Sequence, residues 1–326
     1  MEKHTQRWFE QRERGNRFML LLLAWLALSL GRGFTRVLLY PIVAYYLLSA
    51  RKARVASRLF LRRALNCEPG WRDVFRHFYT FALVSLDRLY FLAGRSEKFD
   101  IEIEGAEVID RCIAGQRGCL LLVSHMGSFD VMRVSGVRKR RLPIRILMDR
   151  AHNSRAMQLM ESLDPQLATA VLDTGTAPAS LALTLHECLG RGDLIGIMAD
   201  RAAPGERVVH SRFLGAGTAL PAGPWLLAIT LKVPVILCVG LYTGGNRYRV
   251  YFESLSGAPG KPGQSELEAM GILDMGVLKV PRKERERALV KLVEHYASRL
   301  EHYARLAPYN WFNFYNFWAD ETATDH

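Results

Sequence analysis

Between residues 99 and 253, short strand-like segments alternate with helix-like segments, and this alternation restricts the possible fold more than any other feature of the chain. Residues 118–124 and 193–199 are almost continuous apolar runs, which are typical of strands buried on both faces. Strands that alternate with helices predict a mostly parallel central sheet that is covered by helices on both faces. We therefore expect an α/β fold.

The boundaries follow from periodicity and from Gly and Pro positions. Strands are predicted at residues 99–104, 118–124, 143–148, 169–172, 193–199, 233–242 and 248–253, and helices at 71–93, 106–115, 129–138, 153–163, 177–190, 221–231 and 282–305. A Gly244-Gly245-Asn246 turn indicates a hairpin between the last two strands. Residues 200–217 are predicted to form a loop, and residues 257–263 a linker or surface loop. Without an internal repeat or a second core, residues 67–326 are expected to form one domain.

Residues 1–66 differ from the rest of the chain in charge and hydropathy. They hold thirteen Lys and Arg against three Glu, a net +10 of the chain's +12. Two apolar runs, 18–30 and 37–48, are each shorter than the ~20 residues that a spanning helix needs, and a basic stretch follows at 51–63. This pattern predicts a helical membrane-anchoring segment, embedded or interfacial, whose basic flank faces an anionic membrane surface. The alternative is a buried core helix followed by a solvated basic helix.

Composition also excludes several classes of protein. The five cysteines form no C-x-x-C pair and no zinc-ligand spacing, so we expect free thiols in a reducing compartment and no metal site. The basic residues near the N-terminus are interleaved with Leu and Val rather than with stacking aromatics, which argues against nucleic acid as a partner.

Polar residues follow four of the predicted strands. His125 and Asp130 follow the first buried strand, Asp149-Arg150 and Asp173-Thr174 follow later ones, and Asp200-Arg201 follows 193–199, with Arg207 and Arg212 further along. Because chemistry in an open α/β sheet lies at the carboxyl ends of its strands, we expect all of these groups except Asp173-Thr174 to converge. The Arg cluster at 201–212 favours phosphate binding over a simple solvated loop, since Arg suits bidentate phosphate contacts.

The stretch SHMGSFD suggests acid–base chemistry. A His accepts a proton near neutral pH, and a carboxylate on its other ring nitrogen fixes the tautomer, so Asp130 is predicted to orient His125. No G-x-S-x-G motif supplies a nucleophile, because Met126 lies two residues before Ser128. His125 would then deprotonate a substrate hydroxyl, which attacks an activated carbonyl. The backbone N–H groups of Gly127 and Ser128 are candidates to hold the oxyanion.

SHMGSFD after an apolar strand also resembles the His-x4-Asp/Glu block of the glycerolipid-type acyltransferase superfamily. The order of later blocks, over roughly residues 10–318, is similar to that of the bacterial late lipid A acyltransferases, which are lauroyl and myristoyl transferase-like enzymes. These blocks are Asp200-Arg201, ERVVHSRFLG at 206–215, Gly223-Pro224 and Val233-Pro234-Val235.

The resemblance implies transfer of a fatty acyl chain from an acyl carrier protein or coenzyme A thioester to a hydroxyl of a membrane lipid or glycolipid. It implies no acyl-enzyme and no cofactor, with His125 as general base, Asp130 as its partner, and Arg150, Asp200 and Arg207 in substrate-binding blocks. The expected location is the cytoplasmic face of a bacterial inner membrane.

The C-terminal stretch NWFNFYNFW (310–318) departs from the lipid A enzymes, which usually end on a basic stretch, so the acceptor stays open. Its aromatics fit packing against the sheet edge or a membrane-interface belt equally well. Two other functions remain open on the sequence alone: a membrane-associated lipid or thioester hydrolase, and a non-enzymatic module that binds anionic lipid.

Overall fold

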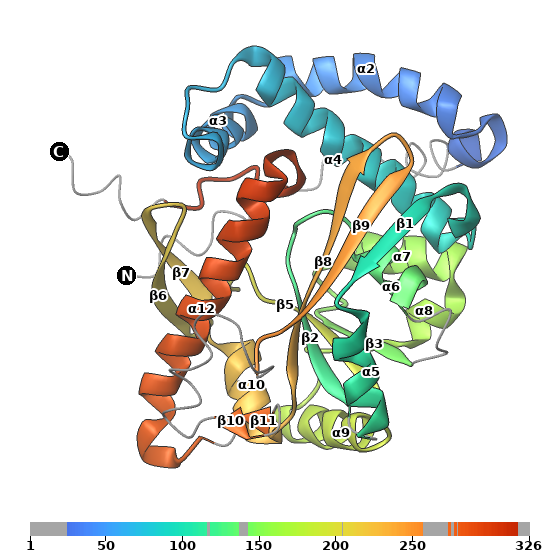
Figure 1. Ribbon diagram of the computed structural model, residues 1–326. Coiled ribbons are helices and arrows are strands. Elements are labelled where there is room, and N and C mark those ends of the chain that lie inside the picture. The colour runs from blue at the N-terminus through green and yellow to red at the C-terminus, as the bar shows by residue number, and fades with distance from the viewer. Residues whose placement is uncertain are drawn as a thin grey trace.

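The computed structural model describes residues 25–115, 118–136, 143–203, 205–256, 273–274, 277–278 and 280–318. Its centre is a seven-stranded, mostly parallel sheet flanked by helices (Figure 1), which confirms the predicted α/β class. The strands are, in spatial order, β1 (Asp100–Glu104), β9 (Arg247–Ser254), β8 (Val235–Gly244), β2 (Cys119–Val123), β5 (Leu194–Met198), β3 (Ile144–Met148) and β4 (Val171–Asp173). Strands β8, β2, β5, β3 and β4 are mutually parallel, and the predicted β8–β9 hairpin is the antiparallel step.

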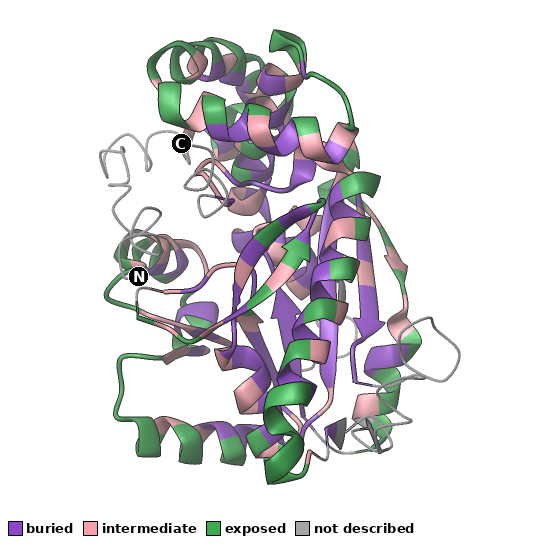
Figure 2. Ribbon diagram, turned by 90° about the vertical axis from the view of Figure 1, so that its left-hand side faces the viewer, coloured by how far each residue is buried: buried purple, intermediate pink, exposed green. Residues whose placement is uncertain are grey.

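Both faces of the sheet are covered, as the continuous apolar run of β2 predicts. All five β2 residues are buried, and they alternate between two cores: Leu120 and Leu122 pack on one side, Cys119, Leu121 and Val123 on the other. In Figure 2 the central strands are largely buried, whereas the outer faces of the helices are exposed. Helices that cover the sheet or its edges are α5 (Ala106–Ala114), α6 (Phe129–Gly136), α7 (Ser154–Leu163), α8 (Pro165–Thr169), α9 (Pro178–Gly190), α10 (Gly223–Leu231) and α12 (Arg285–Leu306).

Three helices at the N-terminal end, α2 (Arg32–Ser49), α3 (Arg51–Leu65) and α4 (Trp71–Leu92), lie together above the end of the sheet toward which β8 runs (Figure 1). A fully buried carboxylate fastens α2 to α4, because the Arg32 guanidinium binds Asp87 through two hydrogen bonds of 2.6 and 2.8 Å. The Tyr248 hydroxyl of β9 donates to the same carboxylate at 2.8 Å. These contacts hold α2 against the α/β core.

Within the described residues, no single helix has the length and apolar character to cross a bilayer, but the pair α2–α3, bent by 97°, meets both criteria together. The first predicted apolar run, 18–30, lies mostly outside the described residues, as does the predicted linker 257–263.

The prediction of a loop over residues 200–217 is wrong from residue 208 onward. Residues Val208–Phe213 (β6) and Ala216–Pro221 (β7) form a separate antiparallel hairpin, which packs beside α12 (Figure 1). Its two-residue turn places Leu214 at φ 51° and Gly215 at φ 80°, both in the left-handed region. Hairpin turns of this kind usually carry Asn or Asp before the Gly, and a buried Leu hides the signal in the sequence.

Candidate active site

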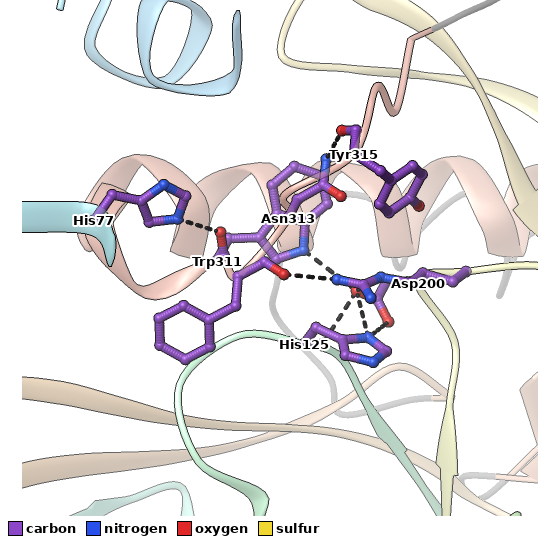
Figure 3. Close-up of polar contacts among 8 residues, drawn as sticks. His77, His125, Asp200, Trp311, Asn313 and Tyr315 are labelled. Atoms are coloured by element: carbon purple, nitrogen blue, oxygen red, sulfur yellow. Dashed lines mark hydrogen bonds and ion pairs between the residues drawn. The ribbon is translucent and has the colours of Figure 1, made fainter. Parts of the chain in front are cut away.

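His125 and Asp200 form the centre of the site. Strands β2 and β5 pair in parallel with Val123 opposite Met198, and each of the two polar residues lies two positions further on. The His125 Nδ1 atom is 3.0 Å from Asp200 Oδ1, and the His125 backbone N–H donates to Asp200 Oδ2 at 3.0 Å (Figure 3). The strand register therefore brings base and carboxylate together.

The protonation states follow from these contacts. Burial opposes the charge of Asp200, but the charge and hydrogen bonds of His125, with the nearby Arg201, hold the pKa of Asp200 well below its usual range. An ionised carboxylate only accepts, so Nδ1 of the neutral imidazole carries the proton and Nε2 keeps its lone pair. Burial, followed by the charge of Arg201, lowers the pKa of His125 despite the opposing attraction of Asp200. His125 is thus neutral and ready to accept a proton near pH 7.

The predicted hydrogen bond between His125 and Asp130 is wrong for this structure. Asp130 lies in the first turn of α6 and forms an ion pair with Arg88 of α4, with Arg88 Nε 3.1 Å from Asp130 Oδ2. Helix α6 begins directly after Ser128, whose Oγ accepts from the Val131 N–H at 3.3 Å. This start directs Asp130 toward α4. Asp130 still lines the same cavity as His125.

Gly127 and Ser128 line this cavity as well, but their N–H groups are not available to an oxyanion. The Gly127 N–H donates to the Asn310 carbonyl and the Ser128 N–H to the Gly240 carbonyl, each at 2.8 Å. Gly127 has φ 65°, and a Cβ there would lie 1.9 Å from the Gly240 carbonyl oxygen. Glycine is therefore required because the turn after β2 presses against the backbone of β8. The sequence-based role of the two N–H groups in holding an oxyanion is wrong for this reason.

Beside His125 lies a cavity of about 560 Å³. It opens between the carboxyl ends of β2, β3 and β5, helices α4, α6 and α7, and the C-terminal segment 312–315. Its lining is mostly apolar, and includes Phe81, Val84, Ile146, Leu147, Met148, Ala156, Met160, Met198, Phe312 and Phe314. A volume of this size and character suits a small apolar ligand or an alkyl chain.

Arg201 supplies a positive charge to this cavity. Its Nη2 donates to the Phe312 carbonyl at 2.7 Å, and its guanidinium lies 5.2 Å from the centre of the Tyr315 ring. Only 13% of the side chain is exposed. These contacts fix the guanidinium within the wall that also carries His125.

The three other predicted arginines do not line the cavity. Arg150 is in the loop after β3, and at the surface its Nη2 lies 3.9 Å from Oε1 of Glu161. Arg207 binds Glu286 of α12 at 2.7 Å, and Arg212 lines a separate groove between β6 and α12. For Arg207 and Arg212 the expected convergence is wrong, because the unpredicted β6–β7 hairpin carries the chain away from the sheet edge.

Several residues of the site were missed by sequence reasoning. Arg88 comes from α4, and Trp311, Phe312 and Tyr315 come from the C-terminal aromatic stretch, whose aromatic composition was the available signal. Trp311 and Trp318 are 0% and 2% exposed, so these two side chains pack inside the molecule rather than at a membrane surface. Among the described residues, no group of His, Cys, Asp or Glu has an arrangement that would hold a metal ion.

The α/β sheet thus places a histidine that is hydrogen-bonded to a carboxylate in the wall of an apolar cavity, an arrangement that suits acid–base chemistry on a substrate with an apolar chain. The profile of the bacterial lipid A biosynthesis acyltransferases matches residues 74–257, more than half of the chain, and the protein belongs to this family. It is therefore an acyltransferase, and membership implies acyl transfer to a lipid A precursor. A comparison with curated proteins finds no significant match.

Proposed function

We propose that this enzyme transfers a fatty acyl chain from an acyl carrier protein or coenzyme A thioester directly to a hydroxyl of a membrane-held lipid A precursor or related glycolipid. His125 is the general base and Asp200 its orienting partner, in place of Asp130. The observation that supports this most is the His125 ring itself: Asp200 occupies Nδ1, and Nε2 is left as an acceptor at the apolar cavity.

The proposed reaction needs no group other than the two substrates. Nε2 of His125 takes the proton of the acceptor hydroxyl as its oxygen attacks the thioester carbon. The guanidinium of Arg201 stabilises the negative charge that develops on the carbonyl oxygen. When the intermediate collapses, the C–S bond breaks, and the departing thiolate receives the proton from the imidazolium. Asp200 stabilises that imidazolium while it exists.

The apolar cavity would bind the acyl chain. Each buried methylene group contributes about 0.8 kcal/mol, so a long chain held there supplies the binding free energy that positions the thioester. The Ser128 Oγ accepts from the Val131 N–H at the start of α6, and among the described residues no hydrogen bond links it to the His125 ring, as activation of a serine nucleophile would require. This arrangement supports direct transfer without an acyl-enzyme.

The N-terminal helices would place the site at the membrane. Helix α2 exposes a row of large apolar side chains, Phe34, Val37, Tyr40, Tyr45 and Leu48, of which Leu48 is 80% exposed. Helix α3 adds a basic surface that includes Arg51, Lys52 and Arg58. An apolar face next to basic residues suits the surface of an anionic leaflet, and the proposed location is the cytoplasmic face of the bacterial inner membrane. Since α4 both contacts α2 and lines the cavity, a lipid acceptor would meet the cavity near the membrane.

The test is mass spectrometry of lipid products. Detergent-solubilised enzyme is incubated with acyl carrier protein thioesters and a bacterial lipid extract that contains lipid A precursors. We expect an acceptor lipid to gain one acyl mass with the wild type and with the His186→Ala variant, which removes an exposed imidazole of α9, but not with His125→Ala. Release of free fatty acid without an acylated lipid would indicate a hydrolase instead. A folded His125→Ala protein with normal transfer would refute the proposed base.

A further inference from the structure

The C-terminal segment 310–318 is bound to the catalytic turn through its backbone. The Phe312 N–H donates to the His125 carbonyl at 2.8 Å, and Met126 and Trp311 form an antiparallel bridge. With the bond from Gly127 to the Asn310 carbonyl, each of the three residues 125–127 pairs with this segment. The segment lies beyond residue 257, where the family match ends.

Trp311 connects this segment to the catalytic carboxylate. Its indole N–H donates to Asp200 Oδ2 at 3.3 Å (Figure 3). The ring is fully buried, and Phe60 and Phe213 contact it edge-on with ring centres at 4.9 and 4.8 Å. These contacts fix the plane of the indole, so its N–H is directed at the oxygen that also accepts from the His125 backbone.

The backbone of Trp311 is held from the opposite side. Its carbonyl accepts from Nε2 of His77 in α4 at 2.8 Å, and the Ser57 hydroxyl of α3 lies 2.8 Å from His77 Nδ1. A carbonyl only accepts, so the proton is on Nε2 and Ser57 donates to Nδ1. Burial lowers the pKa of His77 to about 4, which keeps the ring neutral. A line of hydrogen bonds thus runs from α3 through His77 and Trp311 to Asp200.

We propose that Trp311 is a positioning residue, whose indole N–H holds the Asp200 carboxylate in the orientation that His125 requires for catalysis. This inference rests on the proposed function. Trp311 does not line the cavity, so it acts through Asp200 and not on the substrate.

The charged and polar groups around Asp200 determine how the loss of the Trp311–Asp200 hydrogen bond should change the pKa of His125. His125 and Arg201 face Asp200, the charge of Asp200 also acts on the hydroxyls of Tyr296 in α12 and Tyr315, and the Arg88–Asp130 pair lines the same cavity as His125. Removing the indole N–H leaves every one of these groups in place and takes one donor from the carboxylate. The carboxylate then attracts the imidazolium more strongly, which raises the pKa of His125.

The experiment compares Trp311→Phe with Trp318→Phe. Both tryptophans are buried in the same aromatic cluster and both changes remove an indole, but the Trp318 N–H donates to the Phe213 carbonyl, away from the catalytic pair. Steady-state acyl transfer is measured from pH 5 to 9, together with the unfolding temperature. For Trp311→Phe we expect kcat to fall about tenfold, with KM for the donor unchanged. The acidic limb of kcat/KM should move up by roughly half a pH unit.

In Trp318→Phe the acidic limb of the kcat/KM profile should stay at the wild-type pH, even if the unfolding temperature of this variant drops. If the acidic limb lies at the same pH in both variants, the role of Trp311 is limited to packing and the inference is overturned. To separate lost volume from the lost donor, β-(3-benzothienyl)alanine at position 311 keeps the ring shape without the N–H, and it must reproduce the upward shift. A wild type that forms no acylated lipid in the same assay would instead refute the proposed function, so the two failures are distinguishable.

Discussion

His125 and Asp200 lie at equivalent positions on neighbouring parallel strands, two residues beyond the paired Val123 and Met198. Their contact therefore depends on the register between β2 and β5. Parallel neighbours in register place residues at equivalent positions side by side at the carboxyl edge, and here the N–H of His125 also donates to the carboxylate of Asp200.

The first prediction separates Asp200 from Asp130. Asp200→Asn should lower kcat by about 10³- to 10⁴-fold, because an amide permits the wrong imidazole tautomer and no longer stabilises the imidazolium. Asp130→Asn should cost much less, since Asp130 binds Arg88 rather than His125. Single-turnover acyl transfer checks both. The opposite order of effects would restore Asp130 as the orienting residue.

The second prediction concerns pH. As the proposed base, His125 can accept a proton only when its ring is neutral, so activity should be lost as pH falls through its pKa, which burial and then Arg201 lower from the ordinary value. Arg201→Gln removes the repelling charge, and the acidic limb of kcat/KM should move to higher pH by about one unit. Arg287→Gln, which removes an equal charge from the exposed start of α12, is the control. An unmoved limb in Arg201→Gln would show that this charge does not act on His125.

The third prediction concerns chain length. Ala156 of α7 lines the cavity, so Ala156→Leu should fill part of it and shift donor preference toward shorter acyl chains. Each methylene that no longer fits costs about 0.8 kcal/mol, close to a fourfold loss in kcat/KM for that donor. Gln158→Leu adds an apolar side chain to the exposed face of the same helix and should leave the preference unchanged. Competition between donors of graded acyl length measures the shift. Equal length preferences in wild type and Ala156→Leu would mean that the acyl chain does not bind in this cavity.

The fourth prediction concerns stability. Arg32→Met leaves the Tyr248 hydroxyl as the remaining hydrogen-bond donor, among the described residues, to the fully buried Asp87, and should cost about 3 kcal/mol. The double variant Arg32→Met/Asp87→Leu should recover much of this loss, because it removes the uncompensated charge. Denaturant unfolding in detergent provides the measurement. A double variant that is no more stable than the single one would mean that the uncompensated charge of Asp87 is not the cause of the loss.

Much of the fold is determined by local sequence. The spacing of apolar residues predicted β1, β2, β3, β5, β8, β9 and most helices. Burial on one or two faces of an element produces a regular pattern of apolar residues in its sequence. The β6–β7 hairpin left no such pattern, since its turn carries Leu214 where Asn or Asp is usual. The same sequence placed His125 and Asp200 correctly at strand ends, and it suggested Asp130 as the partner because that residue is near in the chain.

Only the tertiary structure decided which polar groups meet. The insertion of β5 between β2 and β3 made Asp200 the neighbour of His125, and the path of the hairpin separated Arg207 and Arg212 from them. Strand order results from packing between segments far apart in the chain, which no local period encodes. The aromatic stretch at the C-terminus likewise has a clear composition. Its contact with Asp200 arises from a fold that brings residues 111 positions apart within 3.3 Å.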